Sequence, residues 1–101
     1  MARYCSHTLI LPDESRLDNM VVEVDGGGVI AYYPFSGEAH STIYIDAPIL
    51  LTPRADLEGK IVLLSQPGWV LDNNTHTSCL YAYRLTPCPV CMDNHFVMVR
   101  L

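Results

Sequence analysis

The sequence predicts a mostly-β fold, a small sandwich or partly open barrel of about seven or eight short strands. Three observations support this: apolar residues recur in short alternating or β-branched runs, Gly, Pro, Asp and Asn separate these runs at regular intervals, and helical periodicity is almost absent. The length of 101 residues is ordinary for one domain, so we expect residues 1–101 to form a single β domain.

The clearest local pattern is a β-hairpin over residues 17–33. Met20, Val22 and Val24 alternate with their neighbours, as in a half-buried strand. The run Asp25-Gly26-Gly27-Gly28 follows at once and supplies the positive φ values that tight hairpins need. An apolar strand over 29–33 then ends at Pro34.

The other expected strands show the same signals more weakly. β-branched and aromatic residues, which strands prefer, dominate these segments, and turn residues separate them. Besides the hairpin, strands are predicted over 4–11, 42–45, 49–51, 60–64, 79–85 and 95–101. One short helical turn is predicted over 53–58, beginning at Pro53.

Residues 3–53 resemble a known pattern. A strand ending near Pro12 leads to Leu17-Asp18-Asn19-Met20-Val21-Val22-Glu23-Val24, a Gly-rich turn, Val29-Ile30 and Tyr33-Pro34; Glu38, Thr42 and Ile45-Asp46-Ala47-Pro48-Ile49-Leu50-Leu51-Thr52-Pro53 follow. This segment resembles the N-terminal composite β-sandwich of the amidohydrolase superfamily, which in that family leads into a catalytic barrel.

The resemblance stops after Pro53. There the family carries a Gly-hydrophobe-Asp segment with two His one residue apart, which bind the catalytic metal. In this sequence Arg54-Ala55-Asp56-Leu57 follows without a His pair. The barrel itself takes roughly 200 residues or more, and the chain is too short for it. The resemblance therefore implies a free-standing accessory domain and no hydrolase residues.

The charge pattern makes two classes of partner unlikely. The formal net charge is −5 with a pI near 5.1, and Lys60 is the only lysine. Nucleic-acid affinity rests largely on basic contacts to phosphates, so we expect no nucleic-acid partner. Binding to an anionic membrane surface is disfavoured for the same reason.

Apolar runs are strand-sized, such as residues 61–64, and no membrane span or signal-like segment is visible. We therefore expect a cytoplasmic protein whose four Cys are reduced thiols.

The best candidate for a site is a Cys/His set near the C-terminus. The two-residue gap between Cys88 and Cys91 lets two thiolates bind one tetrahedral zinc. Cys79 on the preceding strand and His95, with His76 as an alternative, would complete a structural zinc site. Such a site would stabilise a small domain with a modest core.

Two other interpretations of these residues stay open. The favoured one is that they are independent thiols and surface histidines, since a buried Cys often packs as a small hydrophobe. The other is the redox motif of thiol oxidoreductases, which the pair Cys88 and Cys91 matches in spacing. That motif stands at a helix N-terminus, whereas residues 95–101 alternate as a strand.

No catalytic set emerges from the sequence. His7, His40 and His76 have no nucleophile at a telling spacing, and the adjacent His40 and Ser41 would point to opposite faces of a strand. Tyrosines gather on the predicted strands and either pack in the sheet, which we favour, or line a ligand groove. They are Tyr32, Tyr33, Tyr44, Tyr81 and Tyr83.

These observations favour a non-catalytic structural or interaction domain, a homo-oligomer or protein-binding module acting through its edge strands. A small zinc-stabilised binding module built on Cys88 and Cys91 is the first alternative. A small-molecule-binding β domain that uses the tyrosines and His40 is the second. No catalytic or cofactor-binding residue is predicted.

Overall fold

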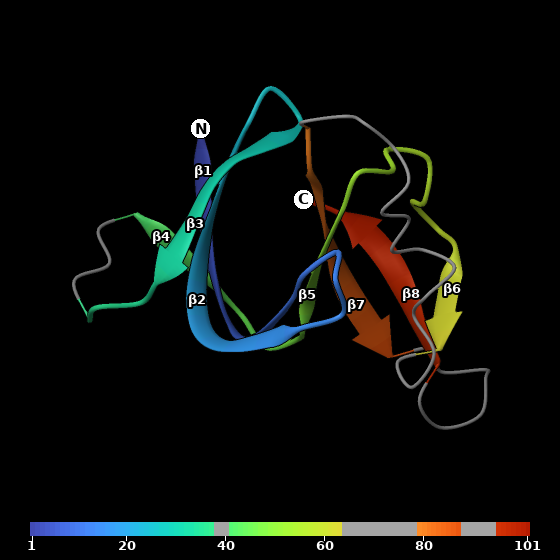
Figure 1. Ribbon diagram of the computed structural model, residues 1–101, viewed down its shortest axis with the longest axis horizontal. Coiled ribbons are helices and arrows are strands. Elements are labelled where there is room, and N and C mark those ends of the chain that lie inside the picture. The colour runs from blue at the N-terminus through green and yellow to red at the C-terminus, as the bar shows by residue number, and fades with distance from the viewer. Residues whose placement is uncertain (38–40, 64–78, 88–94) are drawn as a thin grey trace.

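The computed structural model describes residues 1–37, 41–63, 79–87 and 95–101 (Figure 1). These residues form eight strands: β1 Ala2–Ile10, β2 Arg16–Asp25, β3 Gly28–Pro34, β4 Thr42–Ile45, β5 Ile49–Thr52, β6 Ile61–Leu63, β7 Tyr81–Pro87 and β8 His95–Arg100. The mostly-β prediction is confirmed. Among the described residues no helix is long and apolar enough to span a membrane.

All eight strands belong to one sheet with the order β3-β2-β1-β5-β7-β8-β6. β1 is the organising strand. One of its edges pairs antiparallel with β2 from Ala2↔Val24 to Ile10↔Arg16. The other edge is shared: β4 pairs in parallel with the first half of β1, and β5 pairs in parallel with Leu9 and Ile10.

The sheet curls strongly but does not close. Figure 1 shows β2 and β3 bending over so that the turn between them approaches the start of β7. There Val29 forms an isolated antiparallel bridge with Leu80, and the Val29 N–H donates to the Leu80 carbonyl at 2.8 Å. The result is the partly open barrel, the second of the two predicted forms.

Two apolar clusters lie on opposite faces of this sheet. Consecutive residues of a strand point to opposite faces, so Leu9 and Ile49 enter one cluster while Ile10 and Leu50 enter the other. The cluster inside the curl contains Leu9, Met20, Val22, Val24, Ile45, Ile49, Leu51 and Ala82. The second contains Ile10, Leu50, Leu57, Val62, Tyr83, Leu85 and Met98.

The predicted helical turn over 53–58 is wrong. The segment is a series of bends that crosses the second cluster and inserts Leu57 into it. Its backbone bonds to the sheet: the Tyr83 hydroxyl donates to the Arg54 carbonyl at 2.8 Å and accepts from the Leu57 N–H at 3.3 Å. A segment this short gains too little from its own hydrogen bonds to offset the cost of starting a helix.

Candidate functional site

The outer face of β1 and β2, turned away from the inner cluster, carries an apolar row across four strands. Strand register aligns Tyr44 with Cys5, Cys5 with Val21, and Val21 with Tyr33. Residues opposite one another on paired strands project from the same face. Cys5 is 6% exposed and Val21 is 4% exposed. Side chains outside the sheet must therefore cover the middle of the row.

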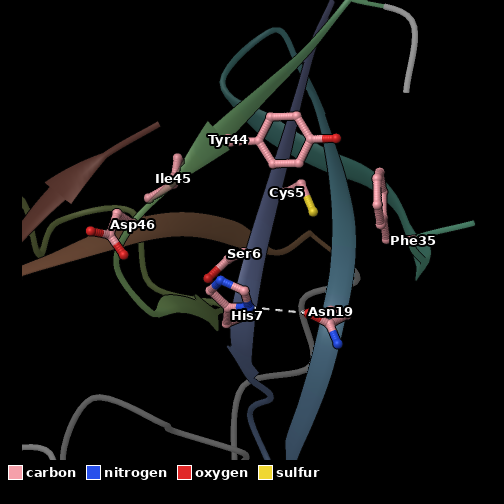
Figure 2. A pocket seen from close by; sticks show the side chains of 8 residues that line it. All are labelled: Cys5, Ser6, His7, Asn19, Phe35, Tyr44, Ile45 and Asp46. Atoms are coloured by element: carbon pink, nitrogen blue, oxygen red, sulfur yellow. Dashed lines mark hydrogen bonds between the residues drawn. The ribbon is translucent and has the colours of Figure 1, made fainter. Parts of the chain in front are cut away.

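Part of that cover is a pair of aromatic rings. Phe35 follows β3 and Tyr44 lies on β4, yet their ring centroids are 5.7 Å apart with an interplanar angle of 79°. Such edge-to-face pairs add about 0.5–1.5 kcal/mol beyond the area they bury. Figure 2 shows the Cys5 thiol beneath and between the two rings. The pair thus joins the two sides of the β1–β2 surface above a buried thiol.

A pocket of about 220 Å³ opens beside these rings (Figure 2). β1 supplies its floor, β2 and the end of β3 supply one side, and β4 with the residue after it supplies the other. The lining residues are Cys5, Ser6, His7, Asn19, Phe35, Tyr44, Ile45 and Asp46. Aromatic, aliphatic and thiol groups make it mainly apolar, with polar groups toward one end.

The polar end is organised by a contact between β1 and β2. His7 Nδ1 lies 3.2 Å from Asn19 Oδ1. An amide oxygen only accepts, so this contact requires a proton on Nδ1 and leaves Nε2 of the neutral ring as an acceptor. Asn19 has a φ of 54°, a left-handed conformation that Asn tolerates better than most residues. The left-handed backbone of Asn19 accompanies the contact of its side chain with the His7 ring.

The chemistry available to Cys5 is limited by its surroundings. Burial raises the pKa of the Cys5 thiol above its ordinary value of 9.0. A reactive cysteine needs the opposite shift, because the thiolate is the nucleophile. His7 is two residues along the same strand, about 6.5 Å away by strand rise. The arrangement suits binding of an uncharged or cationic molecule better than attack by a thiolate.

The structure separates two of the predicted zinc ligands. Cys79 is exposed and stands two residues before Tyr81, where β7 begins. His95 begins β8 and follows the pair Pro87↔Phe96 at the far end of β7. A seven-residue strand spans about 20 Å, whereas zinc ligands bond at about 2.0–2.3 Å. A zinc site that included His95 would therefore leave Cys79 out.

Several other predicted residues lie outside the described part of the chain. They are Cys88, Cys91, His40 and His76. Zinc binding by Cys88 and Cys91 thus stays a prediction. Within the described residues, no group of three or more His, Cys, Asp or Glu side chains is placed to hold a metal ion.

The tyrosines divide into two groups. Tyr83 is fully buried, and Tyr81 lies beneath the Arg100 guanidinium, 4.7 Å from its ring centroid. Both fit the favoured prediction of sheet packing. Tyr32, Tyr33 and Tyr44 are exposed at one end of the sheet, and Tyr44 alone of the five lines the pocket described above.

Sequence reasoning did not find the pocket. One signal was present: Cys5 and His7 are two residues apart on a strand, so they share a face. Asn19, Phe35 and Tyr44 join them only through strand register, which local patterns do not reveal. No protein-family model matches this chain, and no curated protein or solved structure is significantly similar to it.

Proposed function

We propose that this chain is a non-catalytic interaction domain that self-associates through the edge strand β3. In this proposal it acts as a counterpart of the accessory β domain of amidohydrolases. The observation that carries the proposal is the exposed, uncharged edge of β3.

Three large apolar side chains are exposed on β3. Ile30 is 56% exposed, Tyr32 is 41% and Tyr33 is 39%. Among the described residues β3 ends the strand order, and its second edge meets the rest of the sheet only where Val29 bridges Leu80. Such edges are templates for another strand, and proteins usually protect them with charges, bulges or short length. β3 carries no charge and has seven residues, and the register with β2 shifts at Ile30, which forms a bulge and leaves residues 31–34 as the regular part of the edge.

A second copy of the chain is the partner that fits this edge. The sequence of β3, Gly-Val-Ile-Ala-Tyr-Tyr-Pro, contains no charged side chain. Antiparallel pairing of β3 with itself therefore brings no like charges together, although the net charge of the chain is −5. Such pairing has two-fold symmetry, the commonest symmetry of soluble oligomers. Pro34 lacks an N–H and would end the shared ladder.

Two further observations support the remaining parts of the proposal. The raised pKa of the Cys5 thiol favours binding over nucleophilic catalysis. The amidohydrolase part of the proposal rests on the sequence pattern of residues 3–53, in which a Gly-rich turn at Gly26 and Gly27 joins two strands.

The test is the molar mass in solution, measured by light scattering after gel filtration, for the wild type and two variants. Ile30→Lys puts a charge on the β3 edge, and Ile61→Lys puts the same charge on the three-residue strand β6, where Ile61 is 44% exposed. We expect a dimer for the wild type and for Ile61→Lys, and a folded monomer for Ile30→Lys. A monomeric wild type, or an Ile30→Lys dimer as stable as the wild type, would contradict the proposal.

A further inference from the structure

The outer-face pocket also has the features of a small-molecule site, independent of self-association through β3. Its volume of about 220 Å³ is larger than a dry cavity of about 150 Å³ that binds benzene. It lies below the range of about 300–1,000 Å³ typical of drug-sized ligands. The pocket therefore suits a molecule built on a single aromatic ring.

The walls favour an aromatic ring over an aliphatic group. Phe35 and Tyr44 present an edge-to-face pair, a geometry that a third ring can extend. Tyr44 is 65% exposed, so a ligand ring would remove apolar surface from water. Cys5 beneath the rings offers a polarizable sulfur and, with its raised pKa, no negative charge.

The polar end selects the charge of the ligand. Of the eight lining residues, Asp46 is the one with a carboxyl side chain, and Lys and Arg are absent from that lining. The net charge of the chain is −5, which repels anions as well. In Figure 2, Asp46 lies on the opposite side of the pocket from Phe35, and the ring nitrogen of His7 that does not face Asn19 lies toward Asp46.

We propose that this pocket binds a small aromatic amine, with its ring packed against the Phe35–Tyr44 pair above Cys5 and its ammonium group at the Asp46 end. The ammonium donates to the Asp46 carboxylate and to Nε2 of His7, which the Asn19 contact leaves as an acceptor. An aromatic carboxylate of the same size would be repelled by the Asp46 carboxylate at that end.

The experiment is a titration of the full chain, followed by amide NMR shifts, with three probes: benzylamine, benzyl alcohol and benzoate. We expect saturable benzylamine shifts confined to the pocket residues. We expect affinity to fall by about fivefold from the amine to the alcohol, as for a partly exposed ion pair, and further for benzoate. Shifts that do not saturate, that spread over the surface, or that benzoate reproduces at equal affinity would overturn the proposal.

Two matched variants separate a specific site from general charge attraction. Asp46→Asn removes the pocket carboxylate. Asp18→Asn removes one exposed charge from β2 at a residue that does not line the pocket. We expect Asp46→Asn to erase the preference for the amine and Asp18→Asn to retain it. Equal losses in both variants would overturn the proposal.

Two further variants test the contact with the ligand ring and the independence of the pocket from self-association. Tyr44→Leu should weaken benzylamine and benzyl alcohol alike, and undiminished binding of both would count against the assigned ring position. Ile30→Lys should bind benzylamine as the wild type does, because Ile30 does not line this pocket. Failure of the β3 dimer would therefore leave the pocket assignment standing.

Discussion

At the scale of single residues, Tyr83 connects the sheet to the segment between β5 and β6. Its ring is fully buried, and its hydroxyl serves both the Arg54 carbonyl and the Leu57 N–H. Leu57 itself is fully buried in the second cluster. One phenolic oxygen thus replaces the hydrogen bonds that a helical turn would have made.

Tyr83→Phe should destabilise the protein without changing the fold. The ring still fills its site, but two backbone groups lose a partner, and each buried unsatisfied group costs about 1–3 kcal/mol. Urea unfolding of the variant should show a lower midpoint with an unchanged slope. Tyr32→Phe, at an exposed position, is the control and should unfold as the wild type does. Equal midpoints for all three proteins would show that the Tyr83 hydroxyl contributes nothing.

Two buried acids should make the protein sensitive to alkaline pH. Burial raises the pKa of Cys5 above 9.0 and that of Tyr83 above 10.0. Both groups are neutral when protonated, so above these ordinary values the unfolded chain releases its protons first. Their contribution to stability is complete below the unfolded pKa and is lost as pH rises through the raised folded pKa.

The free energy of unfolding should therefore fall as pH rises above 9.0, the ordinary value for Cys5, and fall further above 10.0, that for Tyr83. Urea titrations at a series of pH values measure this slope. Cys5→Ala and Tyr83→Phe should each reduce it. A stability that stays level or increases across this range would contradict the assignment of both shifts.

At the scale of elements, Arg100 on β8 holds the β2–β3 turn. Its Nη2 donates to the Gly27 carbonyl at 2.9 Å, and its guanidinium stacks over Tyr81. A Cβ built on Gly27 would stand 3.0 Å from that Nη2. The contact joins β8 to the turn before the terminal strand β3, close to the Val29–Leu80 bridge.

Gly27→Ala should cost more stability than Gly37→Ala. The two glycines have nearly equal φ values, 86° and 88°, so both substitutions strain the backbone alike. Gly37 has open space where the Cβ would stand, whereas Gly27 faces Arg100. Displacing the guanidinium should add the loss of about one hydrogen bond, roughly 0.5–1.5 kcal/mol. Thermal or urea unfolding measures the difference, and in an Arg100→Ala background it should disappear.

Local patterns predicted the strands well because the order of apolar and polar residues along a strand reflects which of its side chains are buried. The hairpin over 17–33 appears as β2 and β3, and Gly26 and Gly27 adopt the expected positive φ. The parallel pairing of β1 with both β4 and β5 was not predicted, since it depends on contacts between distant segments. The pocket was missed for the same reason: it exists only once β4 lies beside β1.

At the scale of the whole molecule, the fold is one curled sheet with an apolar cluster on each face. Burying large apolar side chains contributes about 1.5–3 kcal/mol each, and both clusters use β1 and β5. Most of the exposed large apolar side chains lie on β3 and β4, and fewer lie on β6 and β8. This distribution places the stable core in the centre and the proposed contact surface at one end of the sheet.

The most direct test of self-association through β3 is amide hydrogen exchange at a low and a high protein concentration. Those N–H groups of residues 30–33 that are not bonded to β2 should exchange more slowly at the high concentration, since pairing with a second copy protects them. Residues 61–63 on β6 should exchange at the same rate at both. Exchange in β3 that does not change with concentration, while the protein is shown to be a dimer, would place the interface elsewhere and contradict the proposal.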